Sequence, residues 1–316
     1  MYGESGRGLL CDLCGETVAD LTPDISGKVG GLKALGKRAG YLGDGVLTAD
    51  KGGAKSGGLV GVMGLDAFRL DGKNAVVTGS HRGIGSAIAV ALAGAGADVV
   101  CHGRAGDGRE IGEQIRGLGQ KAVYVPGDVA DAVVCRELID RAVLELGSID
   151  ILVNNAGIIR RAAAAETSME DWNEVIEVNL TAVFRLSQLA AQWMLGQGRP
   201  GKIVNIASVL SFQGGILVPA YAAAKGGIAQ LTRALANEWA PRKINVNAIA
   251  PGYVATDNTT ALRNDAGRNR QILERIPAGR WGEAGDIGGA AVFLSSAASD
   301  YVHGHVLVVD GGWLGR

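Results

Sequence analysis

The chain has 316 residues, of which 47% are hydrophobic, and a formal net charge of −1. The near balance of acidic and basic residues gives no basis for binding nucleic acid or an anionic membrane surface. The sequence also contains no uninterrupted apolar stretch of about 18 residues, the length needed to span a bilayer. Since the N-terminus also lacks the basic-then-apolar pattern of a secretory signal, we expect a soluble cytoplasmic protein.

Residues 1–62 differ in texture from the rest of the chain. Glycine recurs throughout them, and no apolar period of a helix or strand persists. Such a segment buries too little apolar surface to offset its ordering entropy, so we expect it to be disordered, or a misassigned extension upstream of Met63. Cys11 and Cys14 lack the further ligands that a structural zinc needs, and no metal site is predicted.

From Asp71 onward, short β-branched runs alternate with longer amphipathic stretches, which is typical of a parallel sheet wrapped by helices. Strands are expected at 75–78, 99–101, 122–125, 151–154, 202–207, 244–248 and 306–309. Helices are expected at 83–95, 131–146, 170–195 and 221–239, with a pair within 259–294. The pattern predicts an α/β fold built on a doubly wound parallel sheet of seven strands, with helices on both faces.

A glycine-rich turn follows the first expected strand. Gly79, Gly83 and Gly85 are spaced G-x-x-x-G-x-G and open the first helix. Glycine lets the chain turn tightly and bring the amides of a helix N-terminus against a pyrophosphate. Glycine also ends strands and caps helices, so the glycines alone are weak evidence for a dinucleotide site. The position of the turn after the first strand and the residues that follow make the evidence stronger.

A second group of residues can move a proton. Tyr221 and Lys225 are one helical turn apart, which places the phenol and the ammonium on the same face of a helix. A phenol has a pKa of about 10, so a tyrosine that transfers protons at neutral pH needs positive charge nearby. Ser208, at the end of the fifth expected strand, can donate a hydrogen bond to a substrate oxygen. Taken singly, each of these residues also fits an ordinary structural role.

Together these motifs resemble the short-chain dehydrogenase/reductase family, from Leu70 to the C-terminus. The resemblance rests on Thr78-Gly79-x-x-x-Gly83-Ile84-Gly85, Asn154-Asn155-Ala156-Gly157, Asn179, Ser208, Tyr221-x-x-x-Lys225 and Pro251-Gly252 in this order. It implies that residues 63–316 form a single Rossmann-type domain that binds a nicotinamide cofactor. It also implies a homotetramer, which is common in this family.

The resemblance gives roles to individual residues. Tyr221 is the expected proton donor and acceptor, with its pKa lowered by Lys225 and by the oxidised nicotinamide. Lys225 is also expected to hold the nicotinamide ribose, and Asn179 to position a water that links Lys225 to solvent. The residues expected around the cofactor are Gly79, Ser80, Arg82, Gly83, Ile84, Gly85, Arg104, Asp128, Val129, Asn155, Ala156, Gly157, Tyr221, Lys225, Pro251, Gly252, Val254 and Thr256.

The end of the second expected strand bears on the choice of cofactor. An acidic residue there binds the ribose 2′-hydroxyl of NAD, whereas arginine attracts the 2′-phosphate of NADP. The strand ends without a carboxylate, Gly103 is expected to leave room, and Arg104 and Arg82 could hold a phosphate from two sides. NADP(H) is therefore favoured. NAD(H) stays open, as does the alternative that both arginines are merely solvated.

Further stretches are similar to the branch of 2-deoxy-D-gluconate 3-dehydrogenases and 2-dehydro-3-deoxy-D-gluconate 5-dehydrogenases, namely residues 155–161, 211–215, 247–258 and 275–281. This similarity implies hydride transfer at a keto or hydroxy group of a deoxy sugar acid. Two arginines, Arg160 and Arg161, follow the fourth expected strand, and the similarity favours Arg160 as the partner of the substrate carboxylate. The residues expected to contact this substrate are Arg160, Ser208, Gln213, Tyr221 and Asn258.

Two rival functions stay open on the sequence. A 3-oxoacyl thioester reductase of the same fold would suit the arginines at the end of the second strand equally well. A non-catalytic NADP-sensing protein is the alternative from a different class, and the complete set of Asn179, Ser208, Tyr221 and Lys225 argues against it.

Overall fold

The computed structural model describes residues 64–106 and 108–316. The expectation that residues 1–62 are disordered or misassigned, including the pair Cys11 and Cys14, lies outside the described residues. Within the described part, no helix is long and apolar enough to cross a membrane.

One parallel sheet of seven strands organises the described residues, in the order β3-β2-β1-β4-β5-β6-β7. The chain winds outward from β1 to β3, returns to place β4 beside β1, and winds outward again to β7. The predicted doubly wound sheet is confirmed. The strands are β1 (Asn74–Val77), β2 (Asp98–Gly103), β3 (Ala122–Pro126), β4 (Ile151–Asn154), β5 (Gly201–Ile206), β6 (Ile244–Pro251) and β7 (Val306–Val309).

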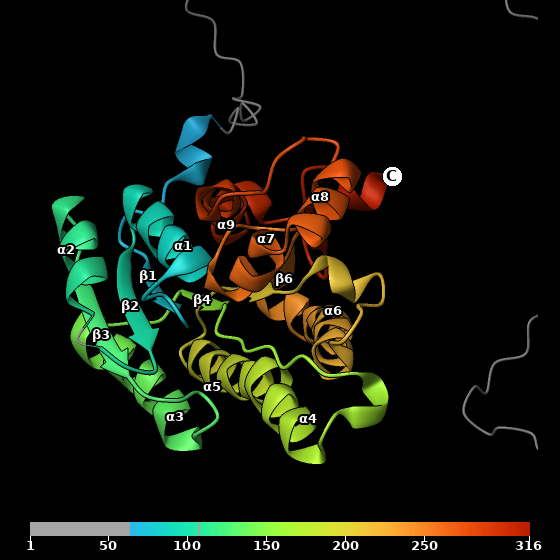
Figure 1. Ribbon diagram of the computed structural model, residues 1–316. Coiled ribbons are helices and arrows are strands. Elements are labelled where there is room, and N and C mark those ends of the chain that lie inside the picture. The colour runs from blue at the N-terminus through green and yellow to red at the C-terminus, as the bar shows by residue number, and fades with distance from the viewer. Residues whose placement is uncertain (1–63, 107) are drawn as a thin grey trace, which may run out of the picture. The chain divides into compact units, whose positions relative to one another are not determined.

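Helices cover both faces of the sheet, and the side chains of β1 show how the two cores arise. Ala75 and Val77 join a core with residues of α1, α2 and α9, whereas Val76 between them joins a core with residues of α3, α5 and α6. Figure 1 shows α1 and α9 above the sheet and α3 and α5 below it. The helices are α1 (Gly83–Gly94), α2 (Arg109–Gly117), α3 (Ala132–Arg141), α4 (Met169–Ile176), α5 (Ala182–Gly196), α6 (Pro219–Trp239), α7 (Thr260–Asn264), α8 (Ala266–Arg275) and α9 (Gly288–Ser295).

Four helical regions differ from the sequence prediction. The helix expected at 131–146 is α3 followed by a π-helical turn at Ala142–Leu146. The pattern does not predict α2, because charged residues and glycine dominate it and its large buried side chains are only Ile111 and Ile115. The helix expected at 170–195 is divided into α4 and α5 by a π-helical turn at Glu177–Thr181. The pair expected within 259–294 is three helices, α7, α8 and α9.

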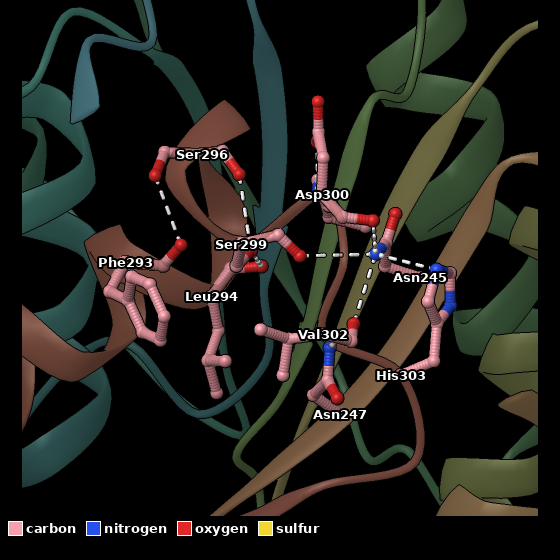
Figure 2. A network of polar contacts seen from close by, with 10 residues as sticks. Asn245, Asn247, Phe293, Leu294, Ser296, Ser299, Asp300, Val302 and His303 are labelled. Carbon is pink, nitrogen blue, oxygen red and sulfur yellow. Dashed lines mark hydrogen bonds and ion pairs between the residues drawn. The ribbon is translucent and has the colours of Figure 1, made fainter. Parts of the chain in front are cut away.

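A polar network joins the start of β6 to the segment that leads into β7 (Figure 2). The Asn245 amide lies within hydrogen-bond distance of the carbonyls of Ser299, Asp300 and Val302, at 3.0–3.2 Å. The Asn247 amide donates to the Val302 carbonyl at 2.8 Å, and its oxygen accepts from the backbone N–H of residue 305 at 3.0 Å. These bonds satisfy the buried backbone of the last connection and hold β7 beside β6.

Candidate active site

A cavity of about 470 Å³ lies at the carboxyl ends of the strands. Its walls come from the turns after β1, β2, β3 and β4, from α6 and from the loop after β6. In an open parallel sheet this is the edge where ligands bind. The predicted residues that line it are Gly79, Arg82, Gly83, Ile84, Gly85, Arg104, Asp128, Val129, Asn155, Ala156, Gly157, Arg160, Tyr221, Lys225, Thr256 and Asn258.

The glycine-rich turn brings the N-terminus of α1 to this cavity. Gly79 and Gly83 have φ angles of +64° and +57°, in the left-handed region that favours glycine. A Cβ at Gly85 would lie 2.2 Å from the Gly79 carbonyl oxygen and 2.3 Å from Nδ2 of Asn155, so only glycine fits. No side chain caps the N-terminus of α1, whose first amides are thus free for an anion. This cradle fits the pyrophosphate of a dinucleotide.

Thr78 and Asn155 fix the turn against β4. The Thr78 hydroxyl accepts from the backbone N–H groups of Asn155 and Ala156 at 2.9 and 3.0 Å. The Asn155 side chain donates to the carbonyls of Thr78 and Gly79 at 2.9 and 3.1 Å. Asn155 therefore shapes the cradle with its side chain, and Thr78 is a supporting residue to which the sequence analysis gives no role.

The structure gives Ser80 a different place from the one predicted. Its side chain is fully buried, and its hydroxyl accepts from the backbone N–H of His102 at 2.9 Å. Ser80 is not among the residues that line the cavity, because this bond turns its side chain toward β2.

The end of β2 is more crowded than the sequence predicts. A Cβ at Gly103 would lie 2.6 Å both from Nδ1 of His81 and from the hydroxyl of Tyr124. The expectation that Gly103 leaves room is therefore wrong, since the His81 imidazole fills that space. Sequence reasoning also missed His81 as a cavity residue, although it lies within the glycine-rich turn. A second cavity at this end is lined by His81, Arg82, Arg104, Ala105, Gly106 and Asp128.

Arg82 and Arg104 both reach this end of the site, but Arg82 is already engaged. It forms an ion pair of 3.0 Å with Asp257, in the loop after β6, and both side chains are more than half exposed. An exposed pair contributes little free energy, so a bound phosphate could compete for Arg82. Arg104 is exposed and lines both cavities.

Ser208, Tyr221 and Lys225 converge at the other end of the site. Lys225 follows Tyr221 by one turn of α6, and its Nζ lies 5.5 Å from the centroid of the Tyr221 ring. Its buried ammonium donates to the Ile206 carbonyl at 2.5 Å. Ser208 follows β5 and is not among the residues that line the main cavity. Its hydroxyl accepts from the backbone N–H of Leu210 at 3.1 Å and also acts to lower the pKa of the Tyr221 phenol. The fold thus brings the three predicted residues together from two elements.

Burial dominates the electrostatics of this group. Burial raises the pKa of Tyr221, while the Ser208 hydroxyl and the positive charge of Arg161 act in the opposite direction. For the chain by itself desolvation is the largest effect, so the expected lowering of the Tyr221 pKa, which relies also on the charge of the oxidised nicotinamide, stays a prediction. Desolvation also lowers the pKa of Lys225 to about 8. At neutral pH the phenol is therefore protonated and Lys225 is mostly charged.

Asn179 lies in the π-helical turn between α4 and α5 and is fully buried. Its side-chain oxygen accepts from the backbone N–H of Ile158 at 2.8 Å, and its amide donates to the Ile158 carbonyl at 2.7 Å. The side chain thus holds the loop after β4, and its expected role in positioning a water beside Lys225 stays a prediction. A π-helical turn displaces backbone carbonyls from the α-helical ladder, and such turns are frequent at functional sites.

The two arginines after β4 have different surroundings. Arg160 forms ion pairs with Glu174 at 2.7 Å and with Asp171 at 3.5 Å. Arg161 donates to a backbone carbonyl in the loop after β6 at 3.0 Å, and its positive charge acts to lower the pKa of Tyr221. Sequence reasoning favours Arg160 for the substrate carboxylate, and in the structure Arg160 lines the main cavity but is paired with two carboxylates. Arg161 is exposed and is not among the residues that line this cavity.

The other predicted substrate residues separate in space. Asn258 lines the main cavity, whereas Gln213 does not. The side-chain oxygen of Gln213 accepts from the Arg275 guanidinium at 3.1 Å. The structure therefore places Asn258, but not Gln213, where it can meet a ligand.

Of the four residues predicted after β6 to contact the cofactor, Thr256 alone lines the main cavity. Pro251 ends β6, and a Cβ at Gly252 would lie 2.6 Å from the Cα of Asp310. Val254 is buried, and with Gly252 it lines a separate cavity of about 250 Å³. Gly252 is therefore needed for close packing against the C-terminal segment.

Comparisons with known proteins agree with this architecture. The chain is 53% identical over 254 residues to 2-dehydro-3-deoxy-D-gluconate 5-dehydrogenase of Escherichia coli K12, which covers 80% of this chain and 100% of that protein. It is 53% identical over 251 residues to the protein of the same name from Bacillus subtilis 168, which covers 79% of this chain and 98% of the relative.

Solved structures are similar as well. A gluconate 5-dehydrogenase from Burkholderia cenocepacia J2315, in complex with NADP and tartrate, is 43% identical and superposes with a TM-score of 0.75, covering 80% of this chain and 99% of the other. A structure from Agrobacterium tumefaciens with bound NADP is 58% identical, with a TM-score of 0.75, and covers 79% and 99% of the two chains.

A family model described as enoyl-(acyl carrier protein) reductase matches residues 79–314. The match includes the glycine-rich cradle, the π-helical turn and the group around Tyr221. This chain therefore belongs to the short-chain dehydrogenase/reductase family.

Proposed function

We propose that this protein is an NADP(H)-dependent oxidoreductase acting on a keto or hydroxy group of a deoxy sugar acid, of the 2-dehydro-3-deoxy-D-gluconate or 2-deoxy-D-gluconate type. The observation that carries the proposal is a single cavity lined by the glycine-rich cradle together with Tyr221 and Lys225. The names of the relatives from E. coli and B. subtilis support the substrate class.

The cradle residues would hold the cofactor. The N-terminal amides of α1 would bind the pyrophosphate, and Lys225 would hold the nicotinamide ribose. Arg104, with Arg82 once it leaves Asp257, would bind the 2′-phosphate of NADP, and the end of β2 carries no carboxylate to repel that phosphate. The NADP-bound relatives support this choice over NAD(H).

When bound, the nicotinamide would supply or accept the hydride. The protein's part is to move the proton. Because the pKa of Tyr221 is raised, its phenol holds a proton that it can give to a substrate carbonyl oxygen during reduction. Ser208 would donate a second hydrogen bond to the same oxygen. In the oxidation direction the phenol must lose its proton first, and the charges of Lys225 and Arg161 beside it would favour that step.

We assign the substrate carboxylate to Arg161, which is exposed and lies outside the lining of the cavity, whereas Arg160 lines it. Arg160 is already paired with Glu174 and Asp171, whereas Arg161 donates to a backbone carbonyl and its positive charge acts on Tyr221. An arginine fork binds a carboxylate through two parallel hydrogen bonds. Arg161 would therefore place the carboxylate of a sugar acid at a fixed distance from the phenol.

The function is tested by following reduced nicotinamide in assays of purified full-length protein with a panel of keto-deoxy and hydroxy sugar acids. We expect turnover of a 2-dehydro-3-deoxy- or 2-deoxy-gluconate with NADP(H). Arg161→Ala should raise KM for the sugar acid by about tenfold or more, whereas the matched Arg160→Ala should change KM less. No turnover of any sugar acid would contradict the proposal.

A second candidate is suggested by the description of the matching family model, which names an acyl carrier protein substrate. A 3-oxoacyl thioester reductase would use the same Tyr221 and Ser208 on a carbonyl but would gain nothing from Arg161. Turnover of an acyl thioester with no turnover of sugar acids would favour this second function.

We also propose that the protein is a cytoplasmic homotetramer, on the strength of its family. Light scattering on the purified protein would measure the assembly. The working domain is proposed to be residues 63–316, because the family model matches residues 79–314 and the relatives align over 254 and 251 residues. A chain that starts at Met63 should keep the kcat and Tm of the full chain, and loss of either would assign residues 1–62 a structural role.

A further inference from the structure

His102 is a buried titratable side chain to which the proposed chemistry gives no role. It lies near the end of β2 and is only 1% exposed. Its imidazole stands between two turns that line the cofactor end of the cavity, one after β1 and one after β3.

The two ring nitrogens have different partners. The backbone N–H of Gly79 donates to Nδ1 at 3.0 Å, so Nδ1 must be unprotonated. Nε2 lies 3.0 Å from the carbonyl oxygen of Gly127, which can only accept. Both contacts are satisfied together by one form of the ring, the neutral imidazole with its proton on Nε2.

Backbone bonds extend the same connection. The Ser80 N–H donates to the His102 carbonyl at 2.8 Å, and the His102 N–H donates to the Ser80 hydroxyl at 2.9 Å. The Gly127 N–H donates to the Gly103 carbonyl at 3.1 Å. The backbone of the turn that cradles the pyrophosphate is thus attached to β2 at His102, and that of the turn that carries Asp128 at the next residue, Gly103.

We propose that His102 is a positioning residue for the dinucleotide, whose neutral imidazole clamps the Gly79 turn to the Gly127 turn in the geometry that binds NADP(H). The proposal rests on the proposed cofactor and deepens that site. It also predicts a pH effect, because a proton on Nδ1 would face the Gly79 N–H donor and open the clamp.

The groups that face this imidazole are His81, from the glycine-rich turn, and Asp128, from the loop after β3. Burial lowers the pKa of His102, and the charge of His81 acts in the same direction, whereas the Gly127 carbonyl and Asp128 raise it. Burial is the largest effect, so the ring stays neutral at physiological pH. The clamp should therefore be closed at neutral pH and open only on acidification.

The test measures NADPH binding by fluorescence titration of the full chain, with no sugar acid present, so it does not depend on the substrate assignment. His102→Leu removes both contacts of the ring, and Kd for NADPH should rise by about tenfold or more at neutral pH. In His102→Asn the side-chain oxygen stands near the position of Nδ1 and can accept from Gly79, so this variant should recover part of the lost affinity.

The effect of pH on NADPH binding distinguishes the clamp from a merely structural role of His102, which would not make binding depend on the protonation of this ring. Between about pH 7.5 and about pH 5, the parent should lose more affinity for NADPH than His102→Asn does, because only the parent carries the imidazole that titrates. His81 is common to both proteins, so the difference between them isolates His102. NMR of the imidazole nitrogens of His102 in the parent protein should show the proton on Nε2. This measurement uses the parent alone, so it does not depend on whether a variant folds.

A proton found on Nδ1 would overturn the proposal, as would a folded His102→Leu protein that binds NADPH with the Kd of the parent. Equal acid sensitivity in the parent and in His102→Asn, when NMR shows that the parent imidazole takes up a proton over the same pH range, would also count against the clamp. If the clamp behaves as expected while no sugar acid is turned over, the substrate assignment fails and the role of His102 stands.

Discussion

The two ends of the cavity are built in different ways. At the cofactor end the shape is fixed by backbone, since glycines with left-handed φ and a helix N-terminus without a side-chain cap form the cradle, and Thr78 and Asn155 hold it by bonds to main-chain atoms. At the substrate end the chemistry depends on side-chain charges, in particular on which carboxylates neutralise Arg160 and which group Arg161 reaches. Substitutions at the cofactor end should therefore often disturb the fold, whereas substitutions at the substrate end should lower activity without lowering stability.

The largest expected effect separates the two ends. Tyr221→Phe removes the proton that is transferred and leaves the cradle intact, so kcat should fall by a factor of about 10² or more while Kd for NADPH stays close to that of the parent. Steady-state kinetics and fluorescence titration measure the two quantities. A variant with kcat within about twofold of the parent would remove Tyr221 from the catalytic role.

A small change at the cofactor end should affect binding and stability together. Gly85→Ala places a methyl group against the Gly79 carbonyl and the Asn155 side chain, at separations that force the turn to move. We expect a loss of about 1–3 kcal/mol in the free energy of unfolding and weaker NADPH binding. Gly94→Ala, at the other end of α1, is the matched control.

At Gly94 a Cβ meets nothing within 4 Å, so the free energy of unfolding should change by less than about 1 kcal/mol and NADPH binding should not change. Urea unfolding and fluorescence titration of the two variants give the comparison. Similar behaviour of Gly85→Ala and Gly94→Ala would show that the cradle is not fixed by close packing.

Arg104 is the side chain proposed to contact the 2′-phosphate at the cofactor end. Arg104→Ala should weaken binding of NADPH by about ten- to hundredfold and of NADH much less, because only NADPH carries the 2′-phosphate. Arg116→Ala, on the exposed face of α2, is the control arginine. Equal effects of Arg104→Ala on the two cofactors would show that Arg104 does not meet the phosphate.

The crowding at Gly103 changes a further test of cofactor choice. Gly103→Asp adds a carboxylate that should repel NADPH, but its Cβ would also collide with His81 and Tyr124. Its effect on selectivity is therefore interpretable only beside Gly103→Ala, which brings the collision without the charge.

Lys225 gives the smallest expected effect, on stability against pH. Its folded-state pKa of about 8 lies below its ordinary value of 10.5, so above pH 8 the unfolded chain binds more protons than the folded one. The contribution of this group to the free energy of unfolding should therefore rise by about 1.5 kcal/mol between about pH 8 and about pH 9.5. In Lys225→Met this rise should be absent, and urea unfolding of both proteins at the two pH values measures the difference.

The sequence determines the cradle and the proton-transfer group because both are local patterns. Three glycines after a strand fix a turn through backbone conformation, and Tyr221 and Lys225 share a face because an α-helix has 3.6 residues per turn. The alternation of short strands and helices likewise predicts the doubly wound sheet. The prediction of helices from this alternation fails at α2, where few apolar residues mark the buried face. It also fails at the π-helical turn between α4 and α5, which interrupts a continuous periodic pattern.

Only the tertiary structure decides the contacts between segments that lie far apart in sequence. It places the His81 ring against Gly103, uses both side-chain groups of Asn179 on Ile158, and turns Ser80 toward β2. The tertiary structure also pairs Arg160 with the carboxylates of α4, and it places Arg161 where its charge acts on Tyr221. Each of these outcomes depends on the distance and burial of the partner, and a pattern of residue types along the chain carries neither quantity.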